Sequence, residues 1–260
     1  MRQWRILVPL TFLFALLALF SAPADAQSRS VTVPRRDIEI QIQPNGDVNF
    51  NETWQVQFSG APPFTFAFRG ILLQRVDSIT NFLVSEGGRA YSQSASESAN
   101  TFKVYTDEGQ QFVRWYFPPT TNQTRTFNLK YTLRGALRIY DGGDQLWWKV
   151  IEGDRAYTIQ NSTTTVRLPA EFPADQILAA VTTGTGEASV RDGKTAVFIS
   201  RDLTPAQELE IRVQFPHGVV TASPPTWQNL EDSEPIFDLG LLFISIIIAV
   251  LGPLLLYLLW

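Results

Sequence analysis

The stretch IQIQPNGDVNFNETWQVQF, residues 40–58, alternates apolar and polar side chains on both sides of a Pro-Asn-Gly turn. A period of two is the pattern of a β-strand that buries one face. A two-residue Asn-Gly turn would place apolar side chains opposite polar ones. A three-residue loop instead pairs Ile42 with Val48 and Ile40 with Phe50, so that the apolar faces match. The stretch therefore predicts a β-hairpin closed by a three-residue loop.

The same alternation recurs along the middle of the chain, as in ELEIRVQF at 208–215, and no helical period interrupts it. Glycine-containing turns separate the strand-like runs. Many short strands without crossover helices predict an all-β fold, an antiparallel β-sandwich. We expect this domain to cover residues 27–217. If it contains two lobes, the break falls near Gly135.

One residue breaks the apolar face of the hairpin. Glu52 lies between Phe50 and Trp54 on that face. A buried carboxylate without a partner costs several kcal/mol, so we expect a buried ion pair with Arg69 or Arg36, with Arg69 preferred. The alternatives are a bulge that turns Glu52 outward and a catalytic acid.

Two adjacent tryptophans stand in DGGDQLWWKVIEGD, residues 141–154. Neighbouring strand residues point to opposite faces, so both rings cannot enter one core. We predict Trp148 to be a core residue, together with Leu146 and Val150. Trp147 then shares the other face with Lys149 and Ile151. We interpret Trp147 and Lys149 either as an ordinary surface pair, with the lysine stem over the ring, or as the candidate surface for a partner or ligand.

Carboxylates flank this strand on both sides: Asp141, Asp144, Glu152 and Asp154. We interpret them as turn residues that cap backbone amides. The alternative is a pair of acids in a hydrolase that acts on envelope polysaccharide. Calcium binding lacks a supporting loop spacing. The sequence predicts no cofactor and no metal site.

The two ends of the chain predict its location. Residues 1–26 combine a basic start, an apolar run and small residues at Ala24 and Ala26, which is the pattern of a cleaved secretory signal peptide. The chain carries no charge from Leu239 to Trp260, and at about 1.5 Å per residue this run reaches roughly 33 Å, enough to span a bilayer. We therefore predict a stalk linker at 218–236 and a transmembrane helix at 237–260. The domain would lie outside the cytoplasm of a single-pass cell-membrane protein.

Composition narrows the chemistry further. The net charge is -4, which gives no basic surface for nucleic acid. Cysteine is absent, so thiol catalysis and disulfides are excluded. His217 is the one histidine, and we expect it to be solvated in the linker, because a His-dependent triad would require it to fold back onto the domain.

Four stretches in order resemble a family of bacterial predicted membrane proteins known as domain of unknown function 2207. They are the opening hairpin at 40–58, FAFRGIL at 66–72, YDGGDQLWWKVIEG at 140–153 and YTIQNSTTTVRLP at 157–169. The sequence departs from the family in having Arg155 and Ala156 before Tyr157, and in stopping after one predicted membrane helix, where family members continue. The resemblance implies an exported domain followed by a membrane helix, and no established activity.

The sequence thus favours a membrane-anchored, extracytoplasmic module that binds a protein or an envelope glycan. An envelope polysaccharide hydrolase is the alternative. We further expect the natural reading frame to continue past Trp260 into a segment rich in arginine and lysine, because the predicted membrane helix has no positive charges on its inner flank.

Overall fold

The computed structural model describes residues 28–232, and this part of the chain is all-β. The predicted signal peptide at 1–26 and transmembrane helix at 237–260 lie outside the described residues. Within 28–232 the only helical segments are too short or too polar to cross a membrane.

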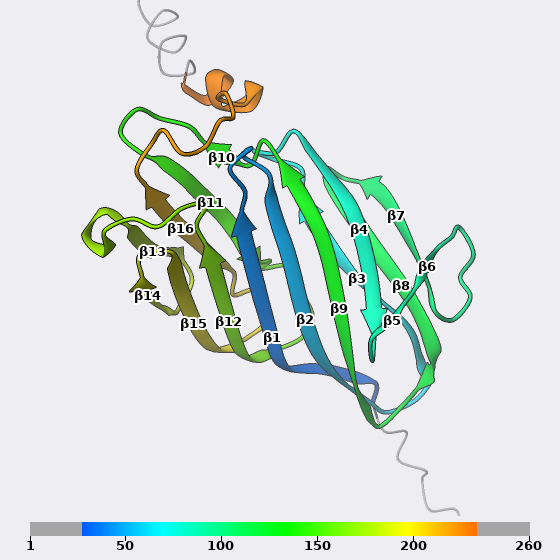
Figure 1. Cartoon of the computed structure of the whole chain (residues 1–260). Helices are drawn as coiled ribbons and strands as arrows, with labels where there is room; N and C mark the ends of the chain where they lie inside the picture. Colours follow the sequence, from blue (N-terminus) through cyan, green and yellow to red (C-terminus); the bar gives the residue numbers. More distant parts are fainter. Residues whose placement is uncertain (1–27, 233–260) are drawn as a thin grey trace, which may run out of the picture.

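One large mixed sheet forms the first layer of a sandwich (Figure 1). Its strand order is β14-β15-β12-β1-β2-β9-β4-β5. In chain order the strands are β1 (Ser30–Ile42), β2 (Val48–Ser59), β4 (Ser78–Glu86), β5 (Arg89–Ala90), β9 (Gln123–Arg134), β12 (Ile159–Arg167), β14 (Glu187–Asp192) and β15 (Thr195–Leu203).

Two four-stranded sheets form the second layer. The first has the order β3-β8-β7-β6 and the second the order β10-β11-β16-β13. A short 3-10 helix, η2 (Ala174–Gln176), precedes β13. The strands are β3 (Phe64–Leu72), β6 (Ser92–Gln93), β7 (Thr101–Asp107), β8 (Gln110–Thr120), β10 (Leu137–Arg138), β11 (Asp144–Ile151), β13 (Leu178–Thr183) and β16 (Leu209–Phe215). One buried apolar cluster joins all three sheets, including Ile40, Val113 and Leu146.

The opening hairpin has the predicted register. Ile40 pairs with Phe50 and Ile42 pairs with Val48. Gly46 has a φ of +86° in the loop, a conformation that favours glycine. A Cβ at Gly46 would also lie 2.5 Å from the side chain of Ala222, so the turn and the segment after the domain are fitted to each other.

The expectation of a purely antiparallel sandwich is wrong at two places. β1 pairs with β12 in parallel, and the short β6 pairs with β7 in parallel. The pairing of β1 with β12 occurs because the chain crosses through the second layer, as β11, before it returns to the large sheet. Sequence alternation alone does not reveal the direction of such a remote partner.

The predicted break near Gly135 divides the second layer but not the large sheet. The large sheet contains strands from both sides of Gly135, with β9 before it and β12 after it. The second layer is divided there, because β3, β6, β7 and β8 precede Gly135, whereas β10, β11, β13 and β16 follow it. The described chain therefore has one shared sheet and a second layer in two parts.

The two tryptophans of β11 lie on opposite faces, as expected. Trp148 is buried and its ring centroid lies 6.3 Å from that of Phe50, whereas Trp147 is half-buried. Ile151 does not share the outer face with Trp147. A β-bulge between Lys149 and Ile151 turns it inward, where it is fully buried.

The predicted stalk differs from the structure over its described part. Residues 226–232 form a short helix that lies against the β domain (Figure 1). Gln228 is buried, and its side-chain amide bonds both the N–H and the C=O of Ile139 at 2.9 Å. Glu231 forms ion pairs with Arg75 at 2.6 Å and Arg138 at 2.9 Å. The chain is therefore held to the domain as far as Asp232, because side chains of this segment satisfy buried groups of the domain.

His217 is exposed, as expected, but it also contacts the domain. Its Nδ1 lies 2.8 Å from Oδ1 of Asp144, which is fully buried, while the imidazole is 37% exposed. The hydrogen bond and the negative charge of Asp144 raise the pKa of His217. The interaction fixes residues after β16 onto the start of β11.

We predict that Trp148→Ala lowers the free energy of unfolding by about 3–5 kcal/mol, as for a buried aromatic side chain. Trp147→Ala should cost about 1 kcal/mol, because its ring is half exposed and is held mainly by surface contacts. Urea unfolding of a fragment covering 28–232 measures both values. Equal losses at the two positions would contradict the assignment of Trp148 alone to the core.

A second prediction concerns pH. A raised His217 pKa in the folded state means that the pair with Asp144 stabilises the fold fully below the unfolded-state pKa of about 6.5. This contribution is lost as pH rises through the folded-state value. The urea midpoint of the wild type should exceed that of His217→Gln at about pH 6, and the difference should shrink by about pH 9. A difference that is constant with pH would refute the charged pair.

Candidate ligand-binding cleft

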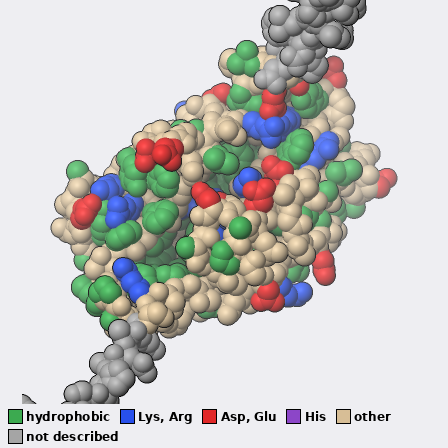
Figure 2. Space-filling model, turned by 180° about the vertical axis from the view of Figure 1, so that it is seen from behind, with side chains coloured by type: hydrophobic (Ala, Val, Ile, Leu, Met, Phe, Trp, Pro, Cys, Tyr) green, Lys and Arg blue, Asp and Glu red, His purple; other side chains and the backbone are tan. Residues whose placement is uncertain are grey.

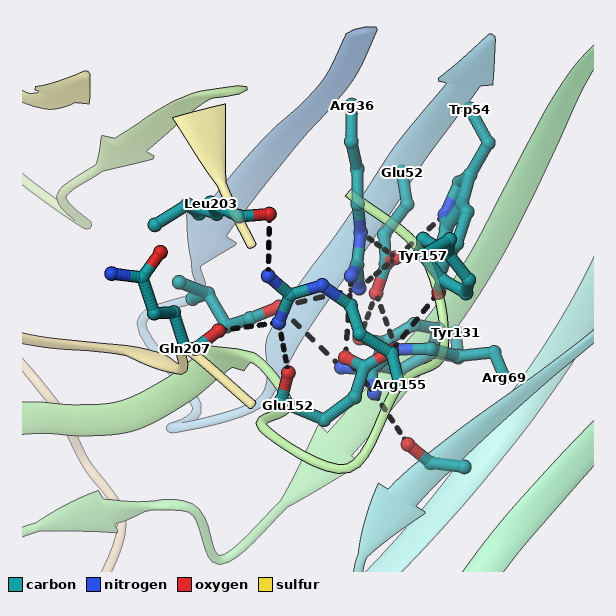
Figure 3. A network of polar contacts seen from close by, with 12 residues as sticks. Arg36, Glu52, Trp54, Arg69, Tyr131, Glu152, Arg155, Tyr157, Leu203 and Gln207 are labelled. Carbon is teal, nitrogen blue, oxygen red and sulfur yellow. Dashed lines mark hydrogen bonds and ion pairs between the residues drawn. The ribbon is translucent and has the colours of Figure 1, made fainter. Parts of the chain in front are cut away.

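A buried ionic network lies where the three sheets meet (Figure 3). Its centre is Glu52 on β2, which is fully buried. Arg36 donates to Oε2 of Glu52 through Nη2 at 2.8 Å, and Trp54 Nε1 donates to the same oxygen at 2.8 Å. Tyr131 donates its hydroxyl to Oε1 at 2.6 Å, and Arg69 Nε lies 3.5 Å from that oxygen. Glu52 is thus paired with both expected arginines, with Arg36 rather than Arg69 as the closer one.

A local irregularity of β1 directs Arg36 inward. The β1–β2 register shifts between Thr32 and Arg35, around Pro34. Val33 is buried before the shift, and Arg36 and Ile38 are buried after it, so the inward face changes from odd to even positions. A proline inside a strand is a recognised sign of a bulge, and Pro34 is the sequence signal that would have placed Arg36 in the core.

The network contains a second carboxylate, Glu152, which follows β11. Glu152 Oε2 lies 2.7 Å from Arg69 Nη1 and 3.2 Å from Arg36 Nη1. The guanidinium groups of Arg36 and Arg69 therefore face the two carboxylates of Glu52 and Glu152. Tyr157 donates its hydroxyl to Glu152 at 3.4 Å. The aromatic residue that follows the departure from the family at Arg155 and Ala156 therefore contacts the network.

The arginines keep both carboxylates ionised. Burial raises the pKa of Glu52, but the charges of Arg36 and Arg69 outweigh it and hold the pKa below its usual range. Burial acts in the same direction on Glu152, and the two arginines lower its pKa to about 2. The ionised form of Glu152 therefore stabilises the fold fully above its usual pKa of 4.5, and this contribution is lost as pH falls through about 2.

The network also satisfies backbone groups at two facing strand edges. Arg69 donates to the carbonyl of Gly70 on β3. Arg36 and Arg69 both donate to the carbonyl of Val150 on β11, at 3.2 and 3.5 Å. β3 and β11 do not pair with each other across the gap between the two small sheets. The arginines therefore supply the hydrogen-bond donors for backbone carbonyls that a neighbouring strand would otherwise supply.

A cleft of about 590 Å³ opens above this gap, between β3 and the strand pair β11–β16. Its lining includes Arg69, Gln74, Trp147, Lys149 and Glu208. This volume lies within the range of small-molecule and peptide-side-chain sites, roughly 300–1,000 Å³. The structure thus places both predicted surface residues, Trp147 and Lys149, in one concave site.

Arginine, rather than the stem of Lys149, covers the Trp147 ring. Arg138 lies 4.9 Å and Arg75 lies 5.6 Å from the ring centroid, within cation–π distance. The indole Nε1 donates to Thr182 Oγ1 at 3.0 Å. Lys149 Nζ instead pairs with Glu208 at 2.5 Å. The Trp147 ring is therefore held in a fixed orientation at the wall of the cleft.

A second, more apolar hollow of about 310 Å³ continues the cleft along β3. The two hollows share Gly70, Gln110, Glu152 and Asp154. Side chains of the large sheet form the base of the second hollow. Aromatic rings of β3, β8 and residue 157 form much of its walls, and charged residues also line it: Arg29, Glu152, Asp154 and Arg155. The face carrying the two small sheets is hollowed, with hydrophobic side chains gathered around the hollow (Figure 2). The cleft therefore has a polar half and an apolar half.

Two of the four flanking carboxylates are not the turn residues that were expected. Asp144 is buried beside His217, and Glu152 belongs to the ionic network. Asp141 and Asp154 are exposed. Sequence reasoning missed Asp144 and Glu152 because their partners are remote in the chain. Among the described residues, no cluster of three or more acidic or histidine side chains is arranged to hold a metal ion.

The fold defines the class of this protein as an all-β domain built on a mixed sandwich. The model of the family described as "Predicted membrane protein (DUF2207) N-terminal domain" matches residues 32–215. The chain belongs to this family, as its sequence motifs indicated, and membership assigns it to the membrane. No curated protein matches the sequence.

Solved structures resemble the chain only weakly. A zinc metallopeptidase of the M1 type from Deinococcus radiodurans is 16% identical, with a TM-score of 0.37, over 72% of this chain and 43% of the other. Native leukotriene A4 hydrolase from Saccharomyces cerevisiae is 12% identical, with a TM-score of 0.46, over 78% of this chain and 33% of the other. This chain spans less than half of either protein, and likenesses of this size carry no functional conclusion.

We predict that Glu52→Gln lowers the free energy of unfolding by about 3–5 kcal/mol, because it leaves buried arginines without their countercharge. Glu39→Gln on the same hairpin is the matched control. Glu39 is exposed, so its replacement should change stability by less than about 0.5 kcal/mol. Urea unfolding compares the two variants, and similar losses would show that the network is not a central element of the fold.

Proposed function

We propose that this protein is a membrane-anchored binding module whose β domain lies outside the cytoplasm and captures a partner in the cleft between the two small sheets. The supporting observation is the cleft itself, in which Trp147, Lys149 and the edge of β3 form walls of fixed geometry. The single membrane span at 237–260 and the exported orientation belong to this proposal.

The charges of the cleft favour binding over hydrolysis. A glycosidase needs one carboxylic acid that stays protonated near neutral pH, beside a second, ionised carboxylate. Glu152 is held ionised by two arginines, with a pKa of about 2. Glu208 is committed to Lys149. The hydrolase alternative would therefore need a different proton donor from either of these two acids.

A photo-crosslinking side chain at Gln74 tests the proposal. Gln74 is exposed and lines the cleft, whereas Gln123, the control position, is exposed outside it. In envelopes of the native host, we expect a discrete adduct from Gln74 and none from Gln123. Adding Trp147→Ala should reduce the adduct by about tenfold or more, as at a binding hot spot.

Two controls define the result. Tyr105→Ala, which removes an exposed aromatic side chain that does not line the cleft, should leave the Gln74 adduct unchanged. Equal adducts from Gln74 and Gln123, or an adduct that survives Trp147→Ala, would show that the cleft does not select a partner.

A further inference from the structure

The strands at the ends of the sheets differ in how they are protected. Edge strands expose unpaired backbone groups, and proteins usually keep such strands short, charged or covered. β5, β6 and β10 have two residues each, and β14 carries three charges in six residues. β13 lies against β14. β3 is different, because it has nine residues and a single charge, Arg69, which is buried.

The register of β3 identifies which of its backbone groups face the cleft. The N–H of Leu73 bonds the carbonyl of Gly109 at 3.0 Å, just beyond the paired residues Leu72 and Gln110. Hydrogen-bonded positions alternate along an antiparallel pair, so odd-numbered residues of β3 bond to β8. The N–H and C=O groups of even-numbered residues therefore point to the open edge: Phe66, Phe68, Gly70 and Leu72. The bond from Arg69 to the Gly70 carbonyl agrees with this direction.

A strand beside this edge would lie along both halves of the cleft. Residues 66–68 of β3 line the apolar half, residues 69 and 71–72 line the polar half, and Gly70 lines both. Every second side chain of an added strand would point inward. In the apolar half such a side chain would meet Val33, Trp54 and Val56, which form part of the base of the hollow.

The charges of the cleft indicate which second side chain the added strand would carry beside its apolar one. Asp154 lines both halves, is exposed, and forms no ion pair with any residue in 28–232. Glu210, at the polar end, accepts hydrogen bonds from Thr182 and Thr183 and likewise has no cation partner in the described chain. Cations do lie nearby, because the buried Arg155 feels the charge of Asp154 and Lys149 is the register partner of Glu210. Two carboxylates that form no ion pair nevertheless favour a basic residue on the bound segment.

We propose that β3 is a docking strand, to which an extended segment of a partner protein adds by backbone hydrogen bonds. This segment places a large apolar side chain in the apolar half of the cleft and a lysine or arginine beside Asp154. Addition of a strand to an open sheet edge is an established mode of peptide recognition. The inference rests on the proposed function and specifies its partner as a polypeptide rather than a glycan.

The test uses the full chain in detergent and a displayed library of random ten-residue peptides as the probe. Enriched peptides should combine a large apolar residue with a nearby basic one. Each is then made in two N-methylated forms, in which alternate amides are blocked on one side of the strand or on the other. One form should lose at least about tenfold in affinity and the other should bind within about threefold of the parent, because only one side faces β3.

A pair of protein variants at one position supplies independent evidence. Phe68 is 54% exposed and its ring lines the apolar half, so Phe68→Ala removes the ring but keeps the backbone N–H. Phe68→Pro also removes an outward N–H, without removing a bond to β8. We expect Phe68→Pro to weaken peptide binding at least about tenfold more than Phe68→Ala. The N-methylated peptides decide the matter on unaltered protein if Phe68→Pro does not fold.

Three results would overturn the docking strand: no enriched peptide, equal binding of the two N-methylated forms, or equal binding to Phe68→Pro and Phe68→Ala. A Gln74 adduct that depends on Trp147 but is unchanged in Phe68→Pro would leave the proposed function standing and remove the docking strand. A Gln74 adduct with a glycan would do the same. Loss of cleft-selective labelling altogether would remove the proposed function itself.

Discussion

The fold depends on how two sheets of four strands share one face of a larger sheet without pairing with each other. Where they meet, the edges of β3 and β11 leave backbone carbonyls with no strand to bond them. Arg36 and Arg69 supply those donors, and Glu52 and Glu152 balance the charge. Burying two arginines is unfavourable unless every charge is paired and hydrogen-bonded. The four side chains therefore act as one unit, which ties both small sheets to the large one.

This arrangement also explains why the molecule has a cleft. A strand between β3 and β11 would have completed a continuous second layer and removed the need for the arginines. The ionic network instead fixes the width of the gap from below, while Trp147 and its neighbouring arginines form a rigid wall at the side. The same side chains that stabilise the fold thus shape the hollow above them, and stability and binding geometry are linked through shared residues.

The features that the sequence predicted correctly are local ones. Face matching across one turn determines the hairpin register, and alternation assigns the two tryptophans to opposite faces. The burial of Glu52 followed from that register, and its partners were expected because an unpaired buried charge is too unfavourable. These features depend on interactions between residues that are close in sequence, or on the need of a buried charge for an opposite charge.

The missed features are contacts between remote segments. The sequences of β1 and β12 would allow either parallel or antiparallel pairing, and only the path of the chain through β11 shows that the pairing is parallel. Asp144, Glu152 and His217 look like ordinary turn and linker residues until the fold brings them to their remote partners. The open edge of β3 is likewise a property of sheet order, which a single strand sequence does not contain. Binding surfaces were therefore harder to predict than the core.

The parallel pairing of β1 with β12 has a consequence for the order of folding. β1 lies in the middle of the large sheet, yet its partner on one side begins only at Ile159. Contacts between such distant segments require a large loop to close first, which slows folding. During synthesis, β1 and β2 can form their hairpin early, but the other edge of β1 must wait, exposed, until most of the domain has emerged. A chain that crosses a membrane before folding would spend this interval as an open template for unwanted strand pairing, and assistance from a chaperone would be most valuable at that stage.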